Sequence, residues 1–313
     1  MRRGIAFKLA LLAGLLAVCS IPAFLPGTAE RTYLFDLLFT LNMAILLASS
    51  WNILGGFAGQ VSFGHAGFYG IGAYTLAILT LRLHWSPWLA LSFSGVGAVL
   101  AALIVGSVSF RLRGPYFALA TLALAEVAKL AAEGLRGLTQ GTQGIVITQA
   151  PLWGLSPGGP FYFLLSLLLA GLGLALALLI RHSDLHYLLR AVGDNEDAAA
   201  AAGINSWRAK ILALGASAFL AGLAGGLGAL HTGFIDPESG FDMAKTVEPI
   251  FMTIVGGIGT VAGPLLGALL LVPVGELLRS QFATAHLLFY GIMLVIFARF
   301  MPKGLMGLFR KKP

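Results

Sequence analysis

The chain has 313 residues, of which 58% are hydrophobic and 11% are charged, and its mean hydropathy is +0.89. Soluble domains usually carry about a quarter charged residues, so the composition excludes a soluble protein and indicates a polytopic membrane protein. The formal net charge is +7, but lysines and arginines fall at the ends of apolar runs and in loops. They therefore indicate membrane topology rather than binding of nucleic acid.

Ten apolar runs follow one another along the chain. They cover residues 4–26, 33–54, 59–81, 87–110, 115–132, 161–181, 209–231, 245–261, 263–279 and 284–301. A helical span needs roughly 20 apolar residues, so the sequence predicts an all-α membrane protein with about ten transmembrane segments in a single domain, residues 1–313. Glycines interrupt the third and eighth runs and predict broken helices there. A division into five and five segments is compatible with an inverted repeat.

Basic residues are distributed unevenly between the two sides of these runs. With the N-terminus in the cytoplasm, thirteen lysines and arginines lie on the cytoplasmic side and six on the external side, which favours both termini in the cytoplasm. The long loop at about 132–160 is then external, and the one at about 182–208 is cytoplasmic. Cys19 is the single cysteine and lies in the first apolar run, which we expect to be a retained span and not a cleaved signal.

The stretch from Trp51 to Tyr74 places seven glycines and several polar side chains among apolar residues. In lipid, such a segment is tolerated only where protein or a water-filled cavity satisfies its backbone. The candidates for a broken helix or for lining a path are Asn52, Gly59, Gln60, Ser62, Gly64 and His65. The structural alternative is the more common one, since glycines at this spacing often serve helix packing and a single intramembrane histidine is often a satisfied core residue.

A second glycine-rich break runs from Gly256 to Pro264, with Gly257 and Gly259 as its candidate residues. It follows an apolar run and lacks the Gly-Lys-Ser/Thr of a phosphate-binding loop, so we expect this chain to bind no nucleotide and no other cofactor. We also expect no metal site and no catalytic residue, because His65 has no second histidine, cysteine or aspartate at ligand spacing nearby.

The predicted cytoplasmic loop reads HSDLHYLLRAVGDNEDAAAAAGINSW from His182 to Trp207. An acidic cluster, five alanines and Gly203 follow one another in it. Alanine favours helix, acidic residues suit the positive end of the helix dipole, and glycine suits the position after the last turn. The sequence predicts a short helix from Asp194 to Gly203, which is either a solvated connector or a docking helix.

Resemblance favours the docking helix. Asp197-Ala198-Ala199, followed after three residues by Gly203, resembles the EAA loop of ABC importer permeases, with Asp in place of the usual Glu. In that family the loop docks into a groove of the ATP-binding subunit. The resemblance implies a coupling role for Glu196, Asp197, Ala198, Ala199 and Gly203.

Four further passages resemble the branched-chain amino acid ABC permeases of the LivM type, in the order of that family. They are NILGGFAGQVSFGHAGFYGIGAYT from Asn52, RLRGPYFALATLALAEV from Arg111 with LTQGTQG from Leu138, RAVGDNEDAAAAAGINSWRAKILALGASAFLAGLAGGL from Arg190, and VGGIGTVAGPLLGALLL from Val255 with FMPKGLMGLF from Phe300. The likeness covers almost the whole chain after the first run.

The resemblance implies one pore-forming subunit of an importer in a bacterial or archaeal plasma (inner) membrane. Its expected partners are a second permease of the same family, two ATP-binding subunits that use the ATP, and an external substrate-binding protein. Leucine, isoleucine and valine are the implied substrates, although relatives carry other amino acids or amides such as urea.

Two other classes of function are compatible with a glycine-broken membrane protein. An ion-coupled secondary transporter usually has carboxylates inside its spans, whereas the apolar runs here are almost free of Asp and Glu outside their ends. An intramembrane enzyme needs a nucleophile with a base, and Ser62 three residues before His65 is insufficient for that.

Overall fold

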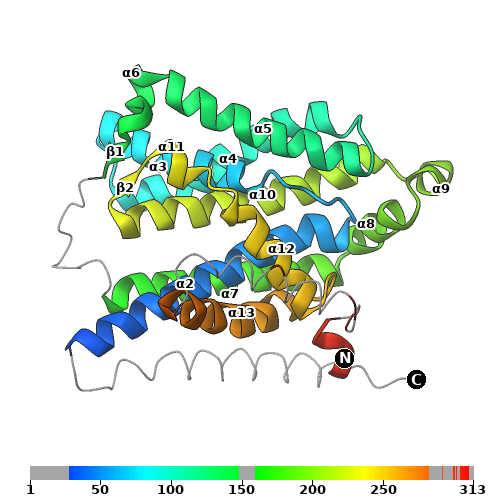
Figure 1. Cartoon of the computed structure of the whole chain (residues 1–313). Helices are drawn as coiled ribbons and strands as arrows, with labels where there is room; N and C mark the ends of the chain where they lie inside the picture. Colours follow the sequence, from blue (N-terminus) through cyan, green and yellow to red (C-terminus); the bar gives the residue numbers. More distant parts are fainter. Residues whose placement is uncertain are drawn as a thin grey trace.

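The computed structural model describes residues 28–147, 159–281, 291, 299, 301 and 304–309, and in these ranges the chain is mostly helical (Figure 1). The α-helices are α2 (Thr28–Trp51), α3 (His65–Leu83), α4 (Pro87–Ser109), α5 (Pro115–Gly134), α6 (Arg136–Thr139), α7 (Pro160–His182), α8 (Asp184–Asp194), α9 (Glu196–Ala201), α10 (Ser206–Thr232), α11 (Pro237–Gly240), α12 (Ala244–Gly256), α13 (Gly263–Gln281) and α15 (Met306–Phe309). A π-helical turn, η2 (Asn52–Phe57), continues α2, and a 3-10 turn, η3 (Gly141–Gln143), precedes the strand β1 (Ile145–Val146), which pairs with β2 (Phe234–Ile235).

Six helices of the described part are long and apolar enough to cross a membrane. They are Arg31–Phe57, His65–Leu83, Pro87–Ser109, Pro115–Gly134, Pro160–His182 and Ser206–Thr232. The expectation of an all-α polytopic protein is confirmed. Of the other four predicted runs, 4–26 and 284–301 fall wholly or mostly outside the described residues, α12 has only 13 residues, and the apolar part of α13 is shorter than these spans. The ten-segment count and the inverted repeat stay predictions.

Proline sets the starts of three spanning helices. Pro87, Pro115 and Pro160 each occupy the first helical position, where the missing N–H has no intrahelical partner in any case and the fixed φ suits the helix. Before α4, the side chain of Ser86 also accepts a hydrogen bond from the backbone N–H of Leu89, which satisfies one free donor of the first turn.

Helix α10 lies at the centre of the packing, against α3, α4 and α2 (Figure 1). Small residues permit its close approach to α3, because a β-carbon at Gly72 would collide with the backbone of Gly222, and one at Gly225 with that of Tyr69. Helix α2 packs on its other side against α7, α12 and α13. The glycines of this region therefore serve helix packing as well as the break described below.

The two long connections lie at opposite ends of the helix bundle. Figure 1 shows β1, β2 and α6 at one end, and α8 and α9 at the other. The strands pair antiparallel with Ile145 opposite Ile235. The loop predicted as external contains the short elements α6, η3 and β1. The loop predicted as cytoplasmic contains α9, which lies within the predicted helix Asp194–Gly203, and also α8, which was not predicted; Asn195 separates the two in an extended conformation.

Candidate functional site

The chain unwinds after α2. The last turn of this helix widens into the π-helical η2, and residues 58–64 form no regular structure before α3 starts at His65. Gly59 has a φ of +66°, which glycine adopts without a steric penalty. The glycine-rich passage therefore contains an unwound segment, but this segment connects α2 and η2 to α3 and does not interrupt a helix as predicted.

Two hydrogen bonds local to this passage fix the unwound segment at Ser62. The indole Nε1 of Trp51 donates to the carbonyl oxygen of Ser62 at 2.9 Å, and the hydroxyl of Ser62 accepts from the backbone N–H of Gly64 at 3.2 Å. Both side chains are buried. They provide hydrogen-bond partners for backbone groups that no water would satisfy inside a membrane.

Two threonines from distant helices complete the hydrogen bonding. The backbone N–H of Phe63 donates to Thr121 Oγ1 of α5 at 3.1 Å, and that of Ala66 donates to Thr246 Oγ1 of α12 at 2.8 Å. At Gly64, a β-carbon would lie 2.7 Å from the carbonyl oxygen of Thr121, so only glycine fits there without a shift. The threonines are functional partners that the local sequence pattern did not reveal.

His65 is fully buried at the junction of three helices. Its Nε2 lies 2.8 Å from the hydroxyl of Ser217 in α10, and that hydroxyl donates to the carbonyl oxygen of Ser50 in α2 at 2.8 Å. This environment fits the structural interpretation of a single intramembrane histidine better than contact with a path. Its role in a path stays a prediction.

The second break lies against the first. The side-chain amide of Asn52 donates to the carbonyl oxygen of Thr260 and accepts from the backbone N–H of Gly259, both at 2.9 Å. Gly257 and Gly259 have φ values of +126° and +70°, and Asn52 is completely buried. The two glycine-rich passages predicted separately thus form one unit joined by Asn52.

The predicted path residues divide into two groups in the structure. Asn52, Ser62, Gly64, His65 and Gly257 are buried, whereas Gly59 is exposed and Gln60 and Gly259 are partly exposed. Val61, which the sequence did not single out, is 43% exposed. Among the predicted path residues, only Gly59, Gln60 and Gly259 are therefore exposed enough to contact a path or a partner.

Helix α9 follows the local signals of the sequence. The Asn195 side chain accepts hydrogen bonds from the backbone N–H groups of Asp197 and Ala198 and so caps the helix. At the other end, Gly203 has a φ of +83° and its N–H donates to Ala200, while the N–H of Ile204 donates to Ala199. This is a Schellman motif, as the glycine predicted.

Ion pairs attach α9 to the spanning helices. Glu196 Oε2 lies 2.7 Å from Nζ of Lys210, whose side chain is only 1% exposed, in α10. Asp197 pairs with Arg113 at 2.8 Å in the connection between α4 and α5, where both side chains are mostly exposed. These two acidic residues, predicted as contacts to an ATPase, are thus engaged within their own chain.

The remaining coupling candidates differ in exposure. Ala199 is buried at 4% exposure, whereas Ala198 and Gly203 are exposed. Tyr187 of α8 and Trp207 of α10 are 70% and 51% exposed. The sequence did not single out either aromatic residue, although exposed aromatic side chains are typical of interfaces.

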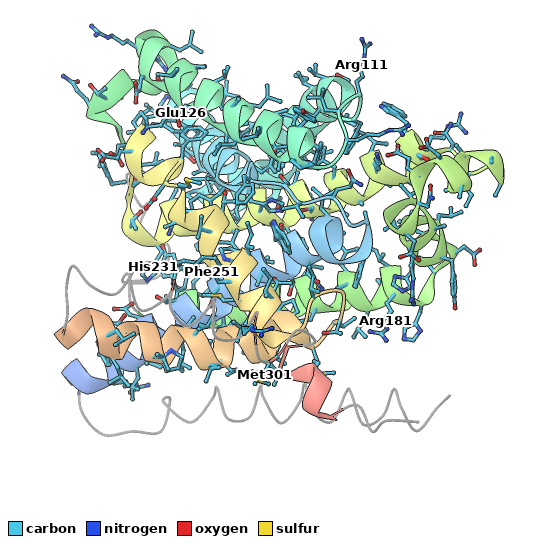
Figure 2. All side chains as sticks on the ribbon, turned by 45° about the vertical axis from the view of Figure 1, so that its right-hand side comes forward. Arg111, Glu126, Arg181, His231, Phe251 and Met301 are labelled. Carbon is cyan, nitrogen blue, oxygen red and sulfur yellow. The ribbon has the colours of Figure 1, made fainter. Side chains whose placement is uncertain are left out.

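Basic residues gather at this end of the bundle. Figure 2 shows Arg111 and Arg181 towards the end that carries α8 and α9, and Glu126 and His231 towards the opposite end. Among the described residues, no group of three or more His, Cys, Asp or Glu side chains is arranged to hold a metal ion. Six apolar helices in the described ranges, two of them joined by a partly buried unwound segment whose backbone bonds to protein partners, define a polytopic membrane protein.

Comparison with known proteins identifies the family. Residues 33–298 match the family model described as "Branched-chain amino acid transport system / permease component". The chain is 31% identical over 297 residues to the high-affinity branched-chain amino acid transport system permease protein LivM of Escherichia coli K12, covering 87% of this chain and 69% of that protein. It is 26% identical over 281 residues to the permease protein LivH of Salmonella typhimurium, covering 84% of this chain and 90% of LivH. No solved structure matches.

The chain belongs to the permease component family of the branched-chain amino acid transport system. It is therefore a membrane permease of LivM type and not an enzyme of the membrane, and the resemblance carried by its glycine-rich and alanine-rich passages is confirmed.

Proposed function

We propose that this chain is one permease subunit of an ATP-driven importer and that it translocates branched-chain amino acids across the plasma membrane. Similarity to both LivM and LivH, two permease proteins of one named transport system, supports a second, related permease as its partner. Two ATP-binding subunits and an external binding protein complete the proposed complex. The ATP is bound by those partners and not by this chain.

One observation carries the proposed mechanism. The unit formed by α8 and α9 contacts the broken end of α2 directly, because Gly193 of α8 lies against the backbone of Ala58 and Gly59. The pair between Glu196 and Lys210 joins the same unit to α10. A force applied to α9 by an ATPase would therefore reach both the unwound segment and the central helix.

The exposed surface of α9 suits such a partner. Ala198 and Gly203 are small and exposed, and Tyr187 and Trp207 are exposed in the helices that precede and follow α9 in the chain. We propose that these residues dock into the ATP-binding subunit, while Glu196, Asp197 and Ala199 hold the docking helix in shape. In this orientation the α8–α9 end, with its arginines, faces the cytoplasm, in agreement with the positive-inside rule, and both termini are cytoplasmic.

The test is uptake by the reconstituted complex. The chain, a second permease, the ATP-binding subunits and the binding protein are assembled in proteoliposomes and supplied with labelled leucine, isoleucine, valine, other amino acids and urea. We expect uptake of the three branched-chain amino acids that requires internal ATP and every subunit. Uptake driven by an ion gradient without the ATP-binding subunits would contradict the proposal, and uptake of urea alone would change its substrate.

A further inference from the structure

A cavity of about 100 Å³ lies between α2, α12 and α13, apart from the unwound segment. One water molecule needs only ~10–15 Å³ on a comparable measure, so the cavity has room for several waters or for part of a small solute. None of the residues predicted from the sequence lines it.

The cavity lies beside the middle of a candidate membrane span. From α2 it is lined by Thr40, Met43, Ala44 and Leu47. The spanning helix that contains them runs for 27 residues from Arg31 to Phe57, so Ala44 is at its centre. The residues of α12 and α13 that line this cavity therefore lie beside the middle of that span.

Three charged side chains line the cavity. They are Lys245 and Glu248 of α12 and Glu276 of α13. Lys245 lies at the start of the apolar run 245–261 and is one of the six basic residues that the sequence assigns to the external side. Helix α12 begins only at Ala244, however, and its first turns line the cavity together with the middle of α2, so these charges lie beside the middle of a candidate span. Charges inside a membrane are costly and typically mark a pathway or a ligand site.

The opposite side of the cavity is apolar. Met43 and Leu47 of α2, Met252 of α12 and Val272 of α13 contribute side chains to it. The ammonium group of Lys245 lies 5.4 Å from the ring centre of Tyr69 in α3, which favours a cation at this place and lies beside the residues that line the cavity without being one of them. One basic residue, two acidic residues and an aliphatic surface thus border one small space.

We propose that this cavity binds a zwitterionic α-amino acid with an aliphatic side chain during its passage through the permease. Lys245 pairs with the carboxylate of the ligand, and Glu248 and Glu276 accept hydrogen bonds from its ammonium group. Met43, Leu47, Met252 and Val272 receive the aliphatic side chain. This inference rests on the proposed function and gives the permease a substrate site of its own, besides that of the binding protein.

Charge-removing variants test the site in the complete reconstituted importer. Lys245→Met and Glu276→Gln should each lower leucine uptake at subsaturating concentration by about 10- to 100-fold, the size expected from losing one hydrogen bond to a charged group. Assembly with the partner subunits and basal ATP hydrolysis should remain. The matched controls Lys129→Met and Glu126→Gln change the same residue types in α5, outside the cavity, and should transport as the wild type does.

A thiol probe makes the test independent of these charges. In a Cys19→Ser chain, Thr40→Cys places a thiol on the cavity wall, and saturating leucine with ATP and binding protein should slow its reaction with a water-soluble thiol reagent. A thiol at Thr142→Cys, in η3, should react at the same rate with and without leucine.

The possible results distinguish a wrong binding site from a wrong proposed function. If the wild type imports leucine while Lys245→Met and Glu276→Gln do the same at the wild-type rate, the site is wrong and the proposed function stands. If leucine leaves the reaction of the Thr40→Cys thiol unchanged in an importing complex, the site is equally overturned. A wild-type complex that imports no aliphatic amino acid overturns the proposed function and this site with it.

Discussion

Gly193 of α8 and Gly59 of the unwound segment touch so closely that a β-carbon on Gly59 would lie 3.1 Å from the α-carbon of Gly193. A β-carbon on Gly193 would in turn lie 3.1 Å from the carbonyl oxygen of Ala58. The contact is backbone against backbone, with no flexible side chain between the two segments. A displacement of α8 would therefore meet the unwound segment with no side chain between them to absorb it.

Enlarging Gly193 should separate these two segments. We expect Gly193→Leu to lower substrate-stimulated ATP hydrolysis and uptake, because a side chain forced into a packed contact costs about 1–3 kcal/mol or displaces one of the elements. The matched control is Gly171→Leu in α7, where a β-carbon meets no atom within 4 Å. Equal uptake by the two variants would show that the contact between α8 and the unwound segment does not transmit motion.

The pair between Glu196 and Lys210 should matter more than the one between Asp197 and Arg113. Removing one member of a buried ion pair typically costs about 3–5 kcal/mol, and we expect somewhat less for Glu196→Gln because Glu196 is 22% exposed. Asp197→Asn breaks an exposed pair, which is typically worth about 0.2–1 kcal/mol. Thermal unfolding of the purified complex measures both.

A double variant gives the control for that comparison. Because the cost of Glu196→Gln is mainly that of a buried, unpaired ammonium group, Lys210→Met should restore most of the lost stability. If Glu196→Gln with Lys210→Met is as unstable as Glu196→Gln alone, the ion pair is not what holds α9 to α10.

Local signals in the sequence were sufficient to predict helix α9. They were insufficient to predict the hydrogen-bond partners of the unwound segment. Asn195, the following acids and Gly203 define a helix start and end within ten residues, so the structure reproduces them. The partners of the unwound segment, Thr121 and Thr246, lie 58 and 180 positions away from the residues they bond. No periodicity or composition links residues so far apart before the helices are packed.

Lys210 shows that the burial of a charged side chain also depends on packing that the sequence does not reveal. In the sequence it is one of several basic residues near a span end and supports a topology. In the structure its side chain is 1% exposed and bonded to Glu196. The sequence could show that a positive charge lies near the interface, but the folding of α9 back against α10 decides that the charge is buried.

The stability of α8 should depend on pH through His186. Burial, together with Arg181, Arg190 and His182, lowers the pKa of His186 below its ordinary value of 6.5, and its ring packs edge-on against Phe57 of η2 with centroids 5.2 Å apart. A histidine with a lowered pKa is held neutral in the folded state. It contributes stability above pH 6.5, and that stability is lost as the pH falls towards the folded pKa.

Exchange of the α8 amides, followed by mass spectrometry between about pH 7.5 and pH 5 after correction for the intrinsic rates, measures this dependence. We expect protection of α8 to fall on acidification in the wild type and to fall less in His186→Phe, which keeps an aromatic ring beside Phe57. His84→Phe, at the left-handed residue after α3, is the control for a histidine elsewhere. An identical pH dependence in His186→Phe and the wild type would assign the effect to other groups.

The orientation of the bundle is open to direct labelling. In a Cys19→Ser background, Ala202→Cys after α9 and Thr142→Cys in η3 each place a thiol at an exposed position, at opposite ends of the bundle. In intact cells, a membrane-impermeant maleimide should label Thr142→Cys alone, and permeabilised cells should also label Ala202→Cys. Labelling of Ala202→Cys in intact cells would place α9 outside and exclude it as a coupling helix.

The role of Gly203 can be separated into backbone strain and docking. Its φ of +83° disfavours any L-residue with a β-carbon, by about 1–2 kcal/mol, so every substitution there destabilises the end of α9 to some extent. A β-carbon at Gly203 meets no atom of this chain within 4 Å. Bulk beyond the β-carbon therefore extends into space that only a partner would occupy.

Three variants at Gly203 separate the effect of backbone strain from the effect of side-chain bulk. Gly203→Asn tolerates the left-handed conformation best, Gly203→Ala carries the strain with little bulk, and Gly203→Trp carries the same strain with a large side chain. We expect Gly203→Asn and Gly203→Ala to retain most of the ATP-binding subunit in a pull-down, and Gly203→Trp to lose both that subunit and substrate-stimulated ATP hydrolysis, while all three insert into the membrane. If Gly203→Trp binds the ATPase and imports substrate as Gly203→Ala does, α9 is a passive connector. The contact with the ATPase then lies elsewhere, and the exposed rings of Tyr187 in α8 and Trp207 in α10 are the next residues to substitute.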